Sequence, residues 1–150
     1  MPANRFLPEE WECRLQEIDL EIARHAVICK IPLLQAGVRH ITIANRTVAK
    51  AEALVASHSA LAALQKAELL ALSPQAVEGN FDVIINATAS SLAGDAVPVP
   101  ASVLRPGSLA YDMMYGPAAQ GFLDWAQAHG AVARDGLGML VEQAAEAFAI

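Results

Sequence analysis

Short apolar runs alternate with longer helical patterns along most of the chain. Residues 81–86 form an almost continuous apolar run, which is typical of a strand buried on both faces of a parallel sheet. Further strands are predicted at residues 38–44, 108–112 and 131–133, and helices at residues 48–57, around 122–126 and at 138–148. Strands that alternate with helices predict an α/β three-layer sandwich, in which helices cover both faces of a parallel sheet.

Three stretches allow more than one interpretation. Apolar residues between positions 11 and 22 recur at helical spacing, whereas residues 18–22 also alternate at period two and fit a short strand; we expect the helix. Residues 25–36 form an apolar run around Pro32, which predicts a helix that starts or kinks near this proline and ends at Gly37. Residues 61–72 are predicted to be partly helical, with a short strand at 69–72 as the alternative.

The composition describes one well-buried globular domain. Hydrophobic residues make up 55% of the 150 residues and charged residues 17%, which is too apolar for disorder. The net charge is −6 and the ten basic residues are scattered, so nucleic acid is not an expected partner.

No apolar run approaches the roughly 20 residues of a membrane-spanning helix, so a cytoplasmic protein is expected. The four histidines show no metal-ligand spacing, Cys13 and Cys29 are expected in the core, and no metal site is expected.

Asn45-Arg46-Thr47 follows the predicted strand at residues 38–44, where a doubly wound fold places the group that contacts the cofactor ribose. A carboxylate at that position selects NAD, because it accepts bonds from the ribose 2′-hydroxyl and repels a 2′-phosphate. The sequence offers a guanidinium instead, and Lys50 lies one helical turn further on. This chemistry predicts a preference for NADP, and the alternative is an exposed arginine at a strand end. Thr47 is also expected to cap the following helix.

Two further motifs follow predicted strands. Asn86-Ala87-Thr88 ends the apolar strand, either beside a ligand or as a turn in which Asn86 and Thr88 satisfy local backbone groups. Asp135-Gly136-Leu137-Gly138 opens the last helix, where two glycines allow the backbone to approach a flat ligand beside the N–H groups of a helix N-terminus. The carboxyl ends of parallel strands are where cofactors bind, so these motifs are candidates for one site.

Together with Tyr111-Asp112-Met113-Met114-Tyr115, these motifs resemble the C-terminal, NADP-binding half of shikimate dehydrogenases, over about residues 38–148. The resemblance implies a Rossmann-type fold. Two alternatives are open for its first strand: residues 18–22 form it, or the N-terminal segment packs as a helix and the first strand is incomplete or rearranged. It also implies that Tyr115 and Gln143 bind substrate and that the Gly136 backbone receives the nicotinamide amide. The cofactor-binding residues that it implies are Asn45, Arg46, Thr47, Lys50, Asn86, Ala87, Thr88, Met113, Gly136 and Met139.

The resemblance implies NADP-dependent interconversion of 3-dehydroshikimate and shikimate in aromatic amino-acid (chorismate) biosynthesis. Family members place their catalytic lysine and aspartate in a separate N-terminal substrate domain, so no catalytic residue is assigned in this chain. Their glycine-rich turn, typically Gly-Ala-Gly-Gly-Ala, would fall near residues 21–25, where this sequence has no glycine. We therefore expect the isolated chain to be inactive or very weak.

The predicted organisation is a single domain, with an atypical N-terminal segment at residues 1–37 packed on an NADP-binding domain at residues 38–150. Besides the small-molecule substrate, the expected partner is a missing substrate domain or a second copy of the chain. One alternative is a truncated, non-catalytic relative that acts as an interaction or dimerisation module. Another is a quinate/shikimate dehydrogenase relative that uses NAD, which Arg46 disfavours.

Overall fold

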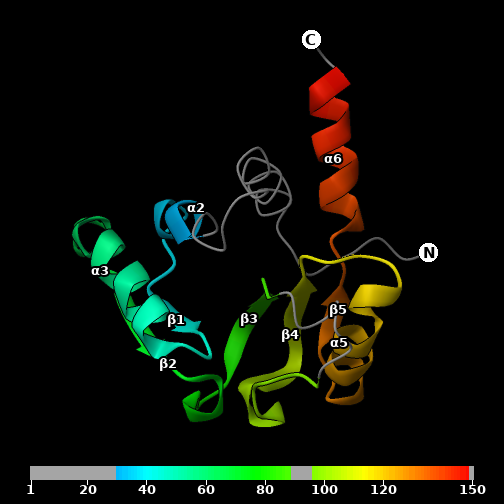
Figure 1. The fold of residues 1–150 in the computed structure, drawn as a ribbon, viewed down its shortest axis with the longest axis horizontal. Coiled ribbons are helices and arrows are strands. Elements are labelled where there is room, and N and C mark those ends of the chain that lie inside the picture. Colours follow the sequence, from blue (N-terminus) through cyan, green and yellow to red (C-terminus); the bar gives the residue numbers. More distant parts are fainter. Residues whose placement is uncertain (1–29, 89–95, 149–150) are drawn as a thin grey trace.

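A computed structural model describes residues 30–88 and 96–148 of the chain (Figure 1). Its strands are β1 (His40–Ala44), β2 (Glu68–Leu72), β3 (Phe81–Asn86), β4 (Leu104–Asp112) and β5 (Val132–Arg134). Its helices are α2 (Lys30–Gln35), α3 (Val48–Leu64), α5 (Pro117–Ala128) and α6 (Leu137–Phe148), with short 3₁₀ helices at Pro74–Ala76 and Ala101–Val103. None of the described helices is long and apolar enough to cross a membrane. The predictions for residues 11–22 and for both cysteines lie outside the described residues.

The strands form two parallel sheets. β1 pairs with β2, β4 pairs with both β3 and β5, and every pair is parallel. Helix α3 packs on β1 and β2, and α5 packs on β4 and β5 (Figure 1). The parallel α/β fold that the alternation of strands and helices predicts is therefore confirmed.

The described strands follow the order of a doubly wound sheet, with one position not filled by any of them. That fold has the strand order 3-2-1-4-5-6. In Figure 1, β2 and β1 lie where the first two strands of this order belong, and β3, β4 and β5 lie where the last three belong. Among the described residues no strand stands between β1 and β3, so each of these strands is paired on one side only.

Strand β3 is less buried than its sequence predicts. The apolar run at residues 81–86 predicts burial on both faces, but Asp82 is exposed and the other residues are only half-buried. The buried strand is β4, in which Ser108, Leu109, Ala110 and Asp112 are all buried. A parallel strand becomes buried when strands flank it on both sides and helices cover its faces. Because β3 has one described neighbour and β4 has two, the prediction of burial is wrong for β3.

Small side chains let α5 pack closely on the three-stranded sheet. Ala119 and Ala126 of α5 are completely buried, as is Ala110 of β4. Phe122 lies in the same core, with its ring centroid 5.6 Å from that of Trp125. This core fixes β4 and β5 beneath the loops that leave their carboxyl ends.

Helix α3 is longer than predicted and has a well-formed end. It continues past the expected last residue at position 57 to Leu64, and the strand alternative at residues 69–72 is confirmed by β2. After the helix, Lys66 adopts a left-handed φ of 55°. Ala67 N donates to Ala62 O at 2.8 Å and Lys66 N to Ala63 O at 3.1 Å, which is the Schellman pattern. Gly37, with φ at 86°, ends α2 as predicted.

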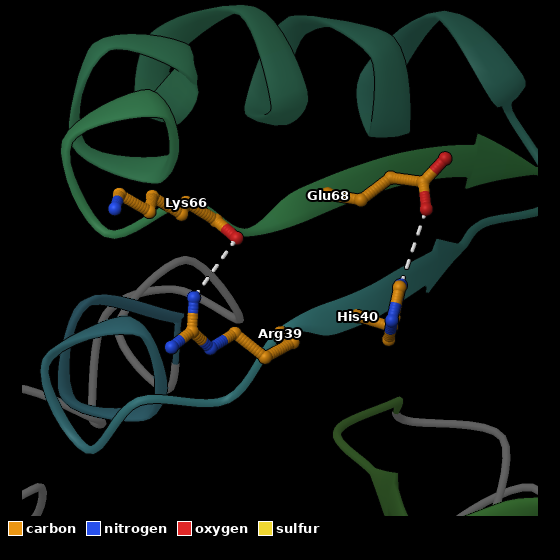
Figure 2. Close-up of polar contacts among 4 residues, drawn as sticks. All are labelled: Arg39, His40, Lys66 and Glu68. Atoms are coloured by element: carbon orange, nitrogen blue, oxygen red, sulfur yellow. Dashed lines mark hydrogen bonds and ion pairs between the residues drawn. The ribbon is translucent and has the colours of Figure 1, made fainter.

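Polar side chains join β1 and β2 at their amino ends (Figure 2). His40 and Glu68 are direct partners in the strand register, and His40 Nδ1 lies 3.1 Å from Glu68 Oε2. Arg39 Nη1 donates to Lys66 O at 3.5 Å. The side chains of His40 and Glu68 are 79% and 72% exposed, so the pair contributes less than about 1 kcal/mol. This end of the sheet is a solvated strand contact, opposite the end that carries the candidate motifs.

Candidate functional site

The chain makes the same turn as it leaves four of the five described strands. In each case a side-chain oxygen accepts a hydrogen bond from the backbone N–H two residues later, which is an Asx turn. The pairs are Asn45 with Thr47 at 2.9 Å, Asn86 with Thr88 at 3.2 Å, Asp112 with Met114 at 2.9 Å and Asp135 with Leu137 at 3.2 Å. The motifs found in the sequence are thus the turns at the carboxyl ends of parallel strands, where cofactor sites form.

The turn after β1 presents a group of hydrogen-bond donors to solvent. Arg46, Thr47 and Lys50 are all exposed, and Arg46 makes no side-chain hydrogen bond or ion pair with any described residue. Thr47 occupies the N-cap position of α3, but its side chain makes no capping bond, so the prediction of a threonine cap is wrong. The Asn45 side chain holds the Thr47 N–H instead, which leaves the Thr47 hydroxyl unengaged. The guanidinium and the hydroxyl of this turn, with the Lys50 ammonium in the first turn of α3, can bind a phosphate.

The turns after β3 and β4 are hydrogen-bonded to each other. Asp112 is completely buried, and its Oδ2 accepts a hydrogen bond from Asn86 Nδ2 at 3.1 Å. Asn86 Oδ1 also accepts a hydrogen bond from the Thr88 hydroxyl at 2.7 Å, and Met113 N donates to Asn86 O at 3.0 Å. The interpretation of residues 86–88 as a local turn is therefore confirmed. Any ligand contact of Asn86 is made in addition to these bonds.

Gly136 joins the start of α6 to the turn after β4. Its N–H donates to Met114 O at 2.8 Å, and its carbonyl accepts a hydrogen bond from Leu140 N at 3.0 Å. A Cβ at this position would lie 2.3 Å from Met113 O, so only glycine fits without a backbone shift. A Cβ at Gly138 would have nothing within 4 Å. The close backbone approach predicted from the glycine pair is therefore made by Gly136 alone, and in this structure its partner is the protein's own backbone.

The residues expected at the substrate and nicotinamide lie on the segments that these bonds hold together. Tyr115 is 49% exposed just after the turn of Asp112, and Met113 is half-buried beside it. Met139 and Gln143 are half-buried on α6, four residues apart and therefore on the same helix face. The hydrogen bonds thus bring together the predicted residues after β3, β4 and β5. The Arg46 group lies apart from them, after β1 in the two-stranded sheet.

Asp112 is the main residue of this region to which the sequence pattern assigns no role. It stands in the motif directly before Met113, but a carboxyl group at the end of an apolar strand gives no direct indication of a ligand. The role of Asp112 could be inferred only from physical chemistry, because a carboxylate that ends a buried strand needs hydrogen-bond donors around it. Within the described part of the chain, no cluster of three or more histidine, cysteine or acidic side chains could hold a metal.

The family model and the curated relatives both carry the name of shikimate dehydrogenases. The family model for shikimate/quinate 5-dehydrogenases matches residues 24–93. A curated shikimate dehydrogenase (NADP(+)) from Verminephrobacter eiseniae is 79% identical over 117 residues, which are 78% of this chain and 41% of that protein. The protein of the same name from Paracidovorax citrulli is 68% identical over 119 residues, which are 79% of this chain and 42% of that protein. The chain thus spans about two fifths of the length of these relatives.

Solved structures give the same fold. The Ael1 enzyme from Pseudomonas putida matches with a TM-score of 0.64 and 46% identity, over 79% of this chain and 42% of its own. The ligand-free 5-ketofructose reductase of Gluconobacter sp. strain CHM43 matches with a TM-score of 0.62 and 35% identity, over 79% of this chain and 43% of its own. Over the region that these matches cover, the chain is similar to shikimate dehydrogenases.

Proposed function

We propose that the chain carries the NADP-binding half of a shikimate dehydrogenase and one wall of its substrate site. The reaction is the interconversion of 3-dehydroshikimate and shikimate, with hydride transfer to or from the nicotinamide. The observation that carries the proposal is the 79% identity, over 117 residues, to a protein named as an NADP-dependent shikimate dehydrogenase. Because the chain spans 41% of that relative, we assign to it the cofactor half rather than the whole reaction.

The donors after β1 fit the 2′-phosphate that distinguishes NADP from NAD. Arg46 supplies a planar fork of N–H donors, Lys50 a point charge and Thr47 a hydroxyl, and all three are exposed. The Asn45 side chain accepts a hydrogen bond from the Thr47 N–H, so the backbone turn that carries Arg46 and Thr47 is formed before any ligand binds. We propose that Asn45, Arg46, Thr47 and Lys50 form the 2′-phosphate end of the cofactor site.

The joined turns after β3, β4 and β5 are proposed to form the nicotinamide end. Asn86, Ala87 and Thr88 lie after β3, Met113 after β4, and Gly136 and Met139 at the start of α6. Bound NADP supplies the group that gives or accepts hydride, and the chain positions it at this edge of the sheet. Tyr115 and Gln143, which flank the same turns, are proposed to contact the hydroxyl or carboxylate groups of the substrate.

The alternative of a non-catalytic interaction module is not favoured. The Verminephrobacter and Paracidovorax relatives both carry the name of an NADP-dependent dehydrogenase. We also infer a cytoplasmic location, since a dehydrogenase of this kind acts on a dissolved metabolite with a dissolved cofactor.

Replacement of Arg46 by alanine is expected to abolish most of the preference for NADP over NAD. A charge-assisted hydrogen bond contributes about 1.5–3 kcal/mol, which is roughly 10- to 150-fold in affinity. We therefore expect the unaltered chain to prefer NADP by a factor in this range and Arg46→Ala to keep only a small part of that preference, from Thr47 and Lys50. Isothermal titration calorimetry with both cofactors measures the two ratios.

A matched control for this substitution lies at the other end of the same strand. Arg39 is also exposed but sits at the amino end of β1, where it donates to Lys66 O. Arg39→Ala should leave the ratio of NADP to NAD affinity unchanged. Equal affinity of the unaltered chain for NADP and NAD would contradict the proposed role of Arg46.

The absolute affinity for NADP is expected to be weak. No glycine-rich turn is present near residues 21–25 to bring backbone N–H groups against the pyrophosphate, and Glu21 adds a carboxylate there. We expect a dissociation constant no better than high-micromolar, which is a binding free energy of about −5 to −6 kcal/mol. Calorimetric titration of the 150-residue chain tests this, with the Verminephrobacter relative as positive control. A sub-micromolar constant for the chain would show that it cradles the pyrophosphate in another way.

A further inference from the structure

Asp112 is a completely buried acidic side chain at the centre of the joined turns. One of its oxygens accepts a hydrogen bond from Asn86 Nδ2 at 3.1 Å, and the other accepts one from Met114 N at 2.9 Å. A buried carboxylate is costly unless hydrogen-bond donors satisfy it, and donors held by a carboxylate are bound strongly. Asp112 is therefore placed to hold β3 and the turn after β4 in one arrangement.

We propose that Asp112 is a positioning residue, which sets the orientation of the Asn86 amide and the path of the chain through Met113–Tyr115. The proposal rests on the proposed function, because the segments that it positions are those assigned to the nicotinamide and the substrate. Asp112 itself is completely buried, so it leaves no surface for either ligand to contact. Its effect reaches the ligands through Asn86 on one side and Met114 on the other.

The orientation of the Asn86 amide follows from which atoms donate and which accept. Asp112 can only accept at Asn86, so the Asn86 NH₂ group points to Asp112. The Asn86 carbonyl oxygen then points to Thr88, where it accepts from both the backbone N–H and the hydroxyl. A rotated Asn86 amide would place its NH₂ group against the Thr88 N–H and lose that bond. The carboxylate at position 112 thus determines the turn at residues 86–88.

The same carboxylate supports the start of α6. By holding the Met114 N–H, Asp112 fixes the residue whose carbonyl oxygen receives the Gly136 N–H at 2.8 Å. Asn86 holds the neighbouring residue, because its carbonyl oxygen accepts from Met113 N at 3.0 Å. A single buried group therefore links the ends of β3 and β4 to the helix that carries Met139 and Gln143.

The first test compares two ligands with the variant Asp112→Asn. NADP spans both ends of the proposed site, whereas adenosine 2′,5′-bisphosphate reaches only the Arg46 end. We expect Asp112→Asn to weaken NADP binding about tenfold and to change binding of adenosine 2′,5′-bisphosphate less than about twofold. Asp124→Asn is the control, because Asp124 is an exposed acid on α5 that accepts a bond from Gln120. Equal weakening of both ligands by Asp112→Asn would overturn the positioning role.

The second test exchanges the two side chains and needs no ligand. In Asp112→Asn the new NH₂ group faces either the Asn86 NH₂ group or the Met114 N–H, so one of these two hydrogen bonds is lost. In Asn86→Asp two carboxylates face each other. The double variant N86D/D112N restores one donor and one acceptor along this contact, and keeps an oxygen for Met114 and another for Thr88. Backbone hydrogen exchange of Met114 and Gly136, followed by NMR, reports whether the turn is held.

We expect exchange at Met114 and Gly136 to be at least about tenfold faster in each single variant and to return to within about threefold of the unaltered rate in N86D/D112N. Single variants that do not fold, together with a folded double variant, would support the proposal equally. A double variant that fails to fold, or a D112N variant with unaltered exchange, would overturn it. Absence of NADP binding in the unaltered chain would reject the proposed function, while the exchange experiment would still decide the role of Asp112.

Discussion

The purified 150-residue chain is expected to give no measurable reduction of NADP with saturating shikimate. Proton transfer by a positioned acid or base contributes roughly 10²–10⁴ in rate, and orientation of the reacting groups contributes more. The resemblance assigns the catalytic lysine and aspartate to a substrate domain, and the chain spans 41% of its Verminephrobacter relative. The residues proposed for this chain account for one wall of the site only: Tyr115 is proposed as a binding group, and Asp112 is completely buried. Absorbance of reduced nicotinamide measures the rate directly.

The Verminephrobacter relative is the matched positive control in this assay, because it is 79% identical over 117 residues. Steady turnover by the isolated chain at a rate comparable to that relative would contradict the prediction. If such turnover were lost in Tyr115→Phe, the chemistry would have to be centred on the wall that this chain carries.

A substrate domain added as a separate chain is expected to restore part of the activity. Helix α6 exposes apolar side chains, with Leu140, Val141 and Phe148 at 38%, 56% and 89% exposure. Exposed apolar residues gathered on one helix indicate a surface that another domain covers. The N-terminal part of the Verminephrobacter relative is the suitable partner, and titration of this part against the chain should produce a saturable rate. Charged substitution at Val141 should abolish that rate.

The elements of the fold follow from local pattern, which is why most of them are predicted correctly. The bounds of β3 match its apolar run, because a continuous run between polar turns is a local feature. The end of α2 at Gly37 is likewise set by a single residue with a left-handed φ. The two-sheet arrangement and the half-buried state of β3 depend on which strands lie beside it, and no local pattern contains that information.

In the candidate site, too, local features can be predicted from the sequence and long-range contacts cannot. The motifs at the strand ends can be found in the sequence because Asn, Asp and Gly mark turns at the ends of apolar runs. The contacts within the site cannot be found in the sequence, because they join residues far apart in the chain. Asp112 accepts a hydrogen bond from Asn86, 26 residues earlier, and Gly136 donates to Met114 across an intervening helix and strand. Thr47 shows that even a local prediction can fail. The Asn45 side chain accepts a hydrogen bond from the Thr47 N–H, and the Thr47 side chain makes no capping hydrogen bond. Long-range contacts decide which of several local options each side chain takes.

Gly136→Ala is expected to destabilise the chain strongly, in contrast to Gly138→Ala two residues later. The Cβ of an alanine at position 136 would lie 2.3 Å from Met113 O, 2.8 Å from Met113 C and 3.3 Å from Met114 O. All three are backbone atoms, so no side-chain rotation relieves the contact. The turn after β4 or the start of α6 must move, and the bond from Gly136 N to Met114 O is lost with that movement.

The expected cost of Gly136→Ala is about 2–3 kcal/mol in the free energy of unfolding, the range for overpacking against groups that cannot give way. Gly138 lies in the first turn of α6, where the methyl group of an alanine would point into open space, so Gly138→Ala should be neutral or stabilising by up to about 1 kcal/mol. The two variants should then differ by roughly 6–12 °C in Tm, measured by circular dichroism on the 150-residue chain. Equal Tm values would mean that α6 does not dock on the Met113–Met114 turn in solution, and the nicotinamide end of the proposed site would lose its support.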